Sequence, residues 1–210
     1  HEWWLPRANQ SVPTHVLKVR AVAAGDEMRP VRFHIVAMQK VINTFLYTEY
    51  LKTKELLRGR REMADGVRMM PADLHEVTCF HGCDPAHKDD ILLYGLRPRS
   101  HPLLPKDIEP TDEGYHGAGS CGVYLARYID YCLKYSNGMR PMASGQEVEV
   151  IVFKVVPGRE YIASALLGPM QEAVPGYDSH VSPNFHEWWL PRANQSVPTH
   201  VLKVRAVAAG

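Results

Sequence analysis

Residues 119–126 read Gly-Ser-Cys-Gly-Val-Tyr-Leu-Ala, a glycine-flanked turn that leads into a short run typical of a β-strand. Two other short motifs lie far from it in the chain, Phe-His-Gly at 80–82 and His-Glu-Trp-Trp-Leu at 186–190. We expect three separate elements to deliver the chemically versatile side chains His81, Tyr124 and Glu187. A histidine, a tyrosine and a carboxylate brought together in this way suit a pocket that grips a dinucleotide and cleaves its glycosidic bond.

The composition indicates one soluble globular domain. The chain has 210 residues, of which 45% are hydrophobic and 22% charged, enough for a sizeable core. Its formal net charge of +1 gives no broad electrostatic case for binding nucleic acid or a membrane surface. No run of about 18 apolar residues occurs, so we expect no membrane-spanning helix.

The four cysteines are Cys79, Cys83, Cys121 and Cys132, and no two of them form a Cys-x-x-Cys pair. Cys79 and Cys83 with His81 between them could be read as a zinc cluster, but the spacing is poor for a structural site and four good ligands are not evident. We expect no metal. Reduced, partly buried thiols in an intracellular protein of the nucleus or cytoplasm are the better interpretation.

Residues 1–25 are identical to residues 186–210, a match too long to arise by chance. The run 199–207 alternates apolar and charged side chains like a half-buried strand, and such a strand has one place in a sheet, so the two copies compete for it. We therefore divide the chain into the duplicate, 1–25, and a domain at 26–210. The duplication reflects a tandem array, an artificial duplication or permutation, or strand exchange in a homo-oligomer. With the first copy docked, Glu2 would take the place of Glu187.

Apolar periodicity outlines the rest of the fold. It predicts strands at 31–36, 76–80, 123–126, 147–156 and 199–207, and helices at 41–57, 88–94 and 127–135. Residues 161–182 read mostly as loop. Strands and short helices alternate without regular β-α-β units, which favours an α+β fold with two mainly antiparallel sheets and short flanking helices.

The glycines and His81 also have ordinary structural interpretations. The run 117–122 is literally Gly-x-Gly-x-x-Gly, but no buried strand precedes it and no helix opens after it, so a Rossmann-type site is not expected. Taken alone, His81 is better explained as a core histidine bonded to backbone. The neighbouring Gly82 favours a ligand-binding role for His81, because a glycine lets backbone groups approach a flat ligand amide.

The aromatic and acidic candidates have similar alternatives. Tyr124 and Tyr135 are more often core aromatics than ligand contacts. Strand alternation alone leaves Glu187 facing solvent at about even odds. Trp188 and Trp189 are neighbours in a strand, so we do not expect both to face inward.

Taken in order, these motifs resemble the catalytic domain of the poly(ADP-ribose) polymerase (PARP) family, from about residue 30 to residue 207. Glu187, eight residues before Gln195 in what we read as one terminal strand, fits the family's last segment. The resemblance is closest to the mono-ADP-ribosylating branch. It rests on the runs 35–54, 80–82, 95–98, 122–126, 176–181 and 194–200.

The resemblance implies an ADP-ribosyltransferase fold and NAD as the substrate. It assigns His81 to the adenosine ribose, the Gly82 backbone to the nicotinamide amide, and Glu187 to the nicotinamide ribose. Tyr124 and Tyr135 would sandwich the nicotinamide ring. The expected catalytic set is Glu187, His81 and Tyr124, and the expected NAD-binding set is His81, Gly82, Tyr115, Tyr124, Cys132 and Tyr135. The physical chemistry agrees, because loss of nicotinamide leaves an oxocarbenium-like ribose that a nearby carboxylate stabilises.

The leading hypothesis is therefore an NAD-dependent ADP-ribosyltransferase that modifies a protein side chain, once per site. Cys132 departs from the family, since it stands where the family has a serine and a thiol is a weaker hydrogen-bonding group. The spacing from Tyr115 to Tyr124 is also about two residues longer than the family's. The runs 122–126, 150–158 and 177–181 are similar as well to pseudo-PARP domains of silencing proteins such as TASOR, which have lost NAD chemistry.

Two other hypotheses stay open. The main alternative is a catalytically inactive pseudo-PARP module that mediates protein interaction and assembly. A weaker one is a toxin-like or nucleic-acid-directed transferase of the same fold, against which the near-neutral charge counts.

Overall fold

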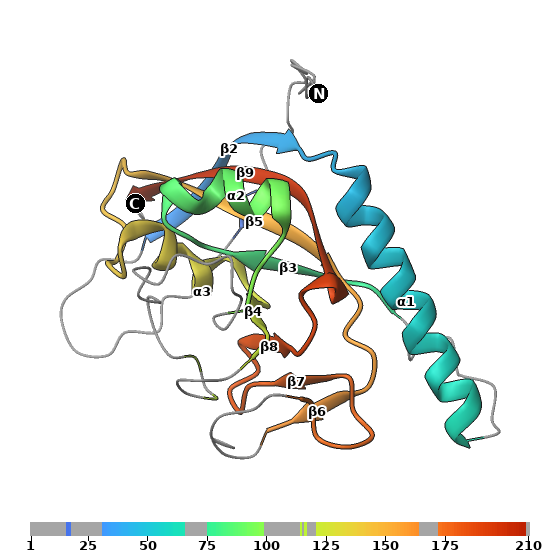
Figure 1. The fold of residues 1–210 in the computed structure, drawn as a ribbon. Coiled ribbons are helices and arrows are strands. Elements are labelled where there is room, and N and C mark those ends of the chain that lie inside the picture. The colour runs from blue at the N-terminus through green and yellow to red at the C-terminus, as the bar shows by residue number, and fades with distance from the viewer. Residues whose placement is uncertain are drawn as a thin grey trace.

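The protein is a mixed α+β structure built on one large sheet (Figure 1). The computed structural model describes residues 16–17, 31–65, 75–98, 114, 116, 121–163 and 172–208. Its strands are β1 Val16–Leu17, β2 Val31–Lys40, β3 Val77–His81, β4 Val123–Ala126, β5 Glu147–Val155, β6 Glu160–Ile162, β7 Ser179–Val181, β8 Glu187–Leu190 and β9 Ser196–Ala208. Its helices are α1 Thr44–Asp65, α2 Pro85–Tyr94 and α3 Ile129–Leu133, with short 3-10 turns η2 Tyr135–Asn137 and η3 Ala193–Gln195.

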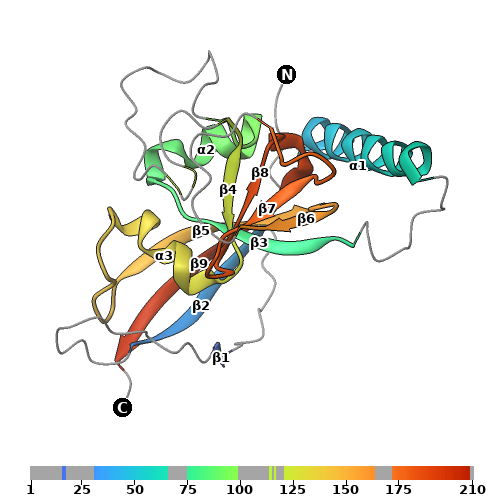
Figure 2. The same cartoon turned by 90° about the horizontal axis from the view of Figure 1, so that it is seen from below.

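The strands hydrogen-bond in the order β1-β2-β9-β5-β3-β4-β8-β7-β6. All neighbouring pairs are antiparallel except β6 and β7, so the predicted α+β class with mainly antiparallel pairing is confirmed. The two sheets expected from sequence are two halves of this one sheet, joined where Phe80 of β3 pairs with Ala126 of β4. Figure 2 shows the long strands β2, β9 and β5 together, with the short strands β4, β8, β7 and β6 turned away from them.

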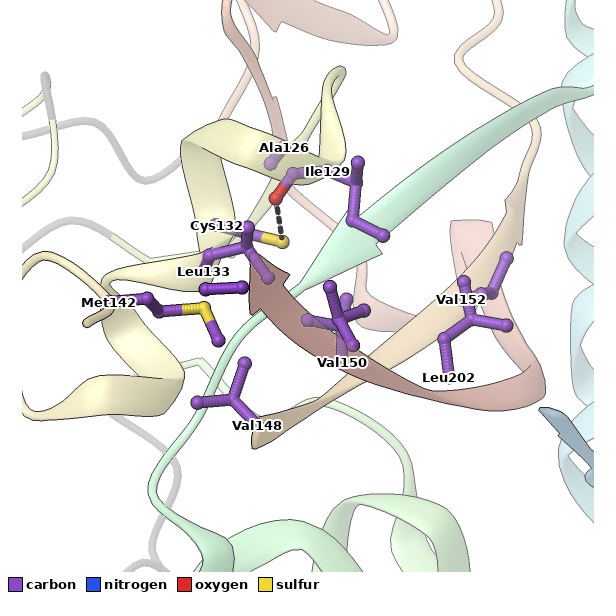
Figure 3. Close-up of a cluster of buried hydrophobic side chains, with 11 residues drawn as sticks. Ala126, Ile129, Cys132, Leu133, Met142, Val148, Val150, Val152 and Leu202 are labelled. Carbon is purple, nitrogen blue, oxygen red and sulfur yellow. Dashed lines mark hydrogen bonds between the residues drawn. The ribbon is translucent and has the colours of Figure 1, made fainter. Parts of the chain in front are cut away.

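Alternation along β5 fills both faces of the sheet. Val148, Val150 and Val152 point to one face, where they pack with Leu202 of β9 and with Cys132 and its neighbours on α3 (Figure 3). The intervening residues Ile151, Phe153 and Val155 point to the other face and pack with apolar residues of β4 and β8. Fully burying such a side chain stabilises the fold by about 1.5–3 kcal/mol, so β5 is the centre of the core.

Helix α1 packs along one end of the sheet. Tyr50 and Leu57, two turns apart on one face of the helix, are buried against Val156 and Val197. The helix begins at Thr44 and ends at Asp65, so it starts later and runs further than the predicted 41–57. A single glycine inside it, Gly59, does not stop it, since a helical glycine costs only about 1 kcal/mol relative to alanine.

The predicted outline of the last third of the chain is partly wrong. Residues 161–182 contribute to the short strands β6 and β7, and their other described residues lie outside helices and strands, as predicted. Glu187 and Gln195 do not share a strand: Glu187 begins β8, and Gln195 lies in the turn η3 before β9. These pieces are too short for apolar periodicity to reveal them.

The expectation that Trp188 and Trp189 cannot both face inward is also wrong. Their exposed fractions are 3% and 0%. Alternation does send them to opposite faces of β8, but both faces of this half of the sheet are covered. Trp188 joins the core with Leu125 and Leu190, and Trp189 packs against histidine rings on the other face.

The second copy of the duplicated segment forms β8, η3 and β9. Of the first copy the structure describes Val16 and Leu17, which form β1 and pair with the outer edge of β2. Glu2 lies outside the described residues, and the division at residue 25 stays a prediction. None of the helices in the described ranges is long and apolar enough to span a membrane.

Candidate functional site

Strands β4 and β8 place Tyr124 and Glu187 on the same face of the sheet, at diagonal positions. Tyr124 pairs directly with Trp189, and Ala126 pairs with Glu187. Directly paired residues, and residues two apart on one strand, point to the same face of a sheet. Tyr124 and Glu187 therefore share a face.

His81, the last residue of β3, is tied to Tyr124 through the backbone. Its ring Nδ1 lies 3.1 Å from the carbonyl oxygen of Tyr124. A carbonyl only accepts, so Nδ1 carries the proton and Nε2 presents a lone pair. Burial lowers the pKa of His81 to about 4, against the opposing effect of this hydrogen bond, so the ring is neutral at neutral pH.

The ring of Tyr124 is contacted by the chain segment just before β4. The backbone N–H of His116 donates to the Tyr124 hydroxyl over 3.4 Å. A Cβ added to Gly114, whose φ is +64°, would lie 2.4 Å from Cζ of Tyr124, so only a glycine fits there. The outer end of the Tyr124 ring is therefore packed by the protein's own backbone. Tyr115, between these two residues, lies outside the described residues.

A row of aromatic rings crosses this half of the sheet, one from each of four strands. Register aligns Tyr124 of β4 with Trp189 of β8, then His180 of β7, then Tyr161 of β6. Ring centroids of Trp189 and His180 are 4.9 Å apart, and those of His180 and Tyr161 are 5.2 Å apart. The indole N–H of Trp189 donates to the carbonyl of Cys121 over 2.7 Å. Side chains of the fold itself thus occupy much of the face that carries Tyr124.

His116 covers this row, and its hydrogen bonds define the state of His180. The backbone N–H of Val174 donates to Nε2 of His180 over 2.9 Å, so Nδ1 of His180 carries the proton. The Nδ1–H of His180 donates to Nε2 of His116, also over 2.9 Å. Burial lowers the pKa of both rings to about 4, and the neighbouring His180 lowers that of His116 further. Both histidines are neutral at neutral pH.

Sequence reasoning missed this histidine pair. His180 stood within the run 176–181, used above only for a family resemblance, and His116 had no periodic context. Nothing in the spacing of two residues 64 positions apart signals a contact.

Glu187 is buried, with an exposed fraction of 7%, so its interpretation as a solvent-facing strand residue is wrong. Its backbone N–H donates to Oγ of Ser182 over 3.1 Å, and its carbonyl accepts from the N–H of Ser182. These bonds fix the start of β8. A buried carboxylate lowers stability unless polar groups surround it. The hydrogen bonds to Ser182, and not contact with water, therefore fix the position of Glu187.

Gly82 lies directly against helix α3. A Cβ built on Gly82 would lie 2.1 Å from the carbonyl oxygen of Cys132 and 3.1 Å from Oγ of Ser136. Ser136 in turn donates its hydroxyl to the carbonyl of Glu149 over 2.6 Å. The backbone beside Gly82 is therefore closed on this side by α3 and η2.

The thiol of Cys132 is used within its own helix. It donates to the carbonyl of Ile129 over 3.1 Å, the bond drawn in Figure 3. Burial raises the pKa of the Cys132 thiol well above its ordinary range, so no thiolate forms at neutral pH. Its sulfur belongs to the apolar cluster under α3.

Tyr135 begins the turn η2 directly after α3, where it contacts Lys134 and Tyr131. Its ring centroid is 6.3 Å from that of Tyr131. The ammonium nitrogen of Lys134 lies over both rings, 4.9 Å from the centroid of Tyr131 and 4.8 Å from that of Tyr135. These are cation–π distances.

The structure thus places Tyr124 and Glu187 on one face of the sheet, joins the His81 ring to the backbone carbonyl of Tyr124, and sets Gly82 against Cys132. Within the described ranges, no group of three or more histidine, cysteine or acidic residues is arranged to hold a metal ion. The assignment of these residues to parts of NAD stays a prediction.

A comparison with solved structures places this architecture in a known class. The chain is similar to the crystal structure of the TASOR pseudo-PARP domain, with a TM-score of 0.62 and 18% sequence identity over 83% of this chain and 84% of that chain. The fold is therefore PARP-like, as the sequence motifs predicted. No protein-family model matches the chain, and no curated protein matches it in sequence.

Proposed function

We propose that this PARP-like domain is an interaction module that binds other proteins and does not turn over NAD. The observation that carries the proposal is the environment of Gly82. The family resemblance assigns the nicotinamide amide to the backbone of Gly82 and to the side chain at position 132. Here the Cys132 thiol is bonded to the carbonyl of Ile129, so the side chain at position 132 serves the fold, and the Cys132 carbonyl closes the side of Gly82 on which a Cβ would stand.

The packing around Tyr124 supports the same proposal. Gly114 and His116 lie against the hydroxyl end of the Tyr124 ring, and Trp189 pairs beside it, so protein groups crowd the ring that would stack on nicotinamide. Likeness in fold to a pseudo-PARP domain adds to this support. Loss of a catalytic site leaves a stable scaffold whose surface can hold partners.

Thermal unfolding with NAD tests the proposal. A ligand that binds only the folded state must raise its stability, so we expect the Tm to be unchanged at any NAD concentration. Intact mass after incubation with NAD should show no added ADP-ribose. Cys132→Ser restores the family's hydroxyl but leaves the carbonyl beside Gly82, so it should also show no shift. A saturable rise in Tm of the unmodified chain would overturn the proposal.

A second candidate function is mono-ADP-ribosylation of a protein side chain, with NAD as the substrate. It is favoured by the shared face of Tyr124 and Glu187 and by the hydrogen bond from His81 to the Tyr124 carbonyl. In this candidate the Glu187 carboxylate stabilises the oxocarbenium-like ribose. The same mass measurement decides it, since label must appear on the unmodified protein and be lost in Glu187→Gln.

A further inference from the structure

Lys134 holds its positive charge over two aromatic rings. The residue is the C-cap of α3, and its backbone keeps helical angles, φ −58° and ψ −36°. From there its ammonium reaches within 5 Å of the ring centroids of both Tyr131 and Tyr135. The quadrupole of each ring attracts a cation to its face, and the negative end of the helix dipole adds to this attraction.

Among the described residues, no carboxylate forms an ion pair with the ammonium of Lys134. None of the ion pairs found between described residues includes Lys134. Within the described part of the chain, the ammonium contacts the two rings. A full positive charge therefore lies against these ring faces.

This matters because the nicotinamide ring of NAD is itself a cation, a pyridinium that stacks on tyrosine partly through the same attraction. Two cations cannot use one ring face, and unit charges within about 7 Å repel appreciably in a partly buried setting. Tyr135 is the residue to which the family resemblance assigns the nicotinamide ring.

We propose that Lys134 is an internal cation that occupies the Tyr131–Tyr135 ring pair and so excludes pyridinium cations from Tyr135. The inference rests on the proposed function, because it names one way in which the domain is closed to NAD. It is independent of the closure at Gly82, which involves backbone and not charge. With the ammonium removed, the ring pair should accept an organic cation from solution.

The test compares a pyridinium with its neutral counterpart. The probe is 1-methylnicotinamide, and the matched neutral probe is nicotinamide. Each is titrated by NMR, following the ring resonances of Tyr131 and Tyr135, into the unmodified domain, Lys134→Gln and Lys134→Arg. Lys134→Gln removes the charge and keeps most of the stem, whereas Lys134→Arg keeps the charge. Lys134→Met is a second neutral variant, and circular dichroism checks that each variant is folded.

We expect 1-methylnicotinamide to bind both neutral variants about 10- to 100-fold more tightly than the unmodified domain or Lys134→Arg, with little change for nicotinamide. Equal binding to charged and neutral variants, or no binding to any of them, would overturn the role of Lys134 and leave the proposed function standing. Binding of NAD itself by the unmodified domain would overturn both.

Discussion

At the scale of single residues, the histidine pair under Trp189 is the most distinctive arrangement. His116 and His180 have exposed fractions of 1% and 0%, and one hydrogen bond joins their rings. The donor from Val174 fixes which nitrogen of each ring carries a proton. A second proton would sit on Nε2 of either ring, where that nitrogen now accepts a hydrogen bond. The protonated Nε2 would then face the N–H of Val174 or of the His180 ring, so the fold requires both rings to be neutral.

This arrangement predicts a pH dependence of stability. Burial lowers the pKa of both rings to about 4 in the folded state, from about 6.5 in the unfolded chain. Between these values the unfolded chain binds more protons, so the free energy of unfolding falls as the pH is lowered. The stabilisation is complete above about pH 6.5 and is lost towards about pH 4. We expect a decrease of up to about 3 kcal/mol for each ring, measured by urea unfolding.

His180→Gln provides the comparison. Its free energy of unfolding should fall less steeply over this pH range, whereas the exposed variant His75→Gln should keep most of the original slope. An identical slope in His180→Gln and the unmodified protein would contradict the assignment.

Gly82 gives a second prediction at this scale. In Gly82→Ala the new Cβ would meet the backbone oxygen of Cys132, which cannot rotate away as a side chain would. Overpacking of this kind costs about 1–3 kcal/mol or more, so we expect a destabilisation of at least about 2 kcal/mol. Thermal and urea unfolding measure it.

Gly59→Ala is the matched control. No atom lies within 4 Å of its added Cβ, and the residue is inside α1. Alanine is the better helix former, so this variant should be more stable by about 0.5–1 kcal/mol. A tolerated Gly82→Ala would mean that α3 can move away from β3.

At the scale of elements, one side chain sets how α1 meets α2. Oδ1 of Asn43 accepts from the N–H of Leu46 and caps the first turn of α1. Its Nδ2 donates to the carbonyls of Leu92 and Leu93 at the end of α2, each over 3.0 Å. Asn43, just before α1, therefore also binds the last carbonyls of α2.

Asn43→Ala should lower the free energy of unfolding by about 1–2 kcal/mol, because it removes the cap and leaves two carbonyls of α2 without this donor. Asn43→Ser keeps an acceptor for Leu46 but cannot reach α2, so it should recover about half of that loss. Urea unfolding of the three proteins separates the two contributions. Equal stability of the alanine and serine variants would show that the cap contributes nothing.

Elements also show what the sequence could and could not predict. β4 matches its predicted bounds, and β5 is one residue shorter than predicted, because both alternate or run apolar between clear turns. The strands β6, β7 and β8 were missed as separate elements, since each has three or four residues and owes its pairing to neighbours far away in the chain. Burial of Glu187 escaped prediction for the same reason: its surroundings come from elements absent from its local sequence.

At the scale of the whole molecule, the sheet is two halves that meet at a narrow seam. The core of one half lies on β5 and β9, and the short strands of the other half carry Tyr124, Glu187 and the aromatic row. The PARP-like class could be predicted from the order of the motifs, whereas the pairing of the Tyr124 strand with the Glu187 strand is seen only in the structure. What the order could not supply is the packing of His116, Trp189 and Cys132, and this packing is the basis for proposing a binding module rather than an enzyme.

The position of β9 has a consequence for how the chain is made. β9 lies between β2 and β5 in the sheet. These two earlier strands therefore cannot be linked through β9 until residues 196–208 have been synthesised. Residues 11–23, however, carry the same sequence and are synthesised first. A nascent chain therefore already holds the sequence of its missing central strand, and we expect the final copy to compete with the earlier one for the place between β2 and β5.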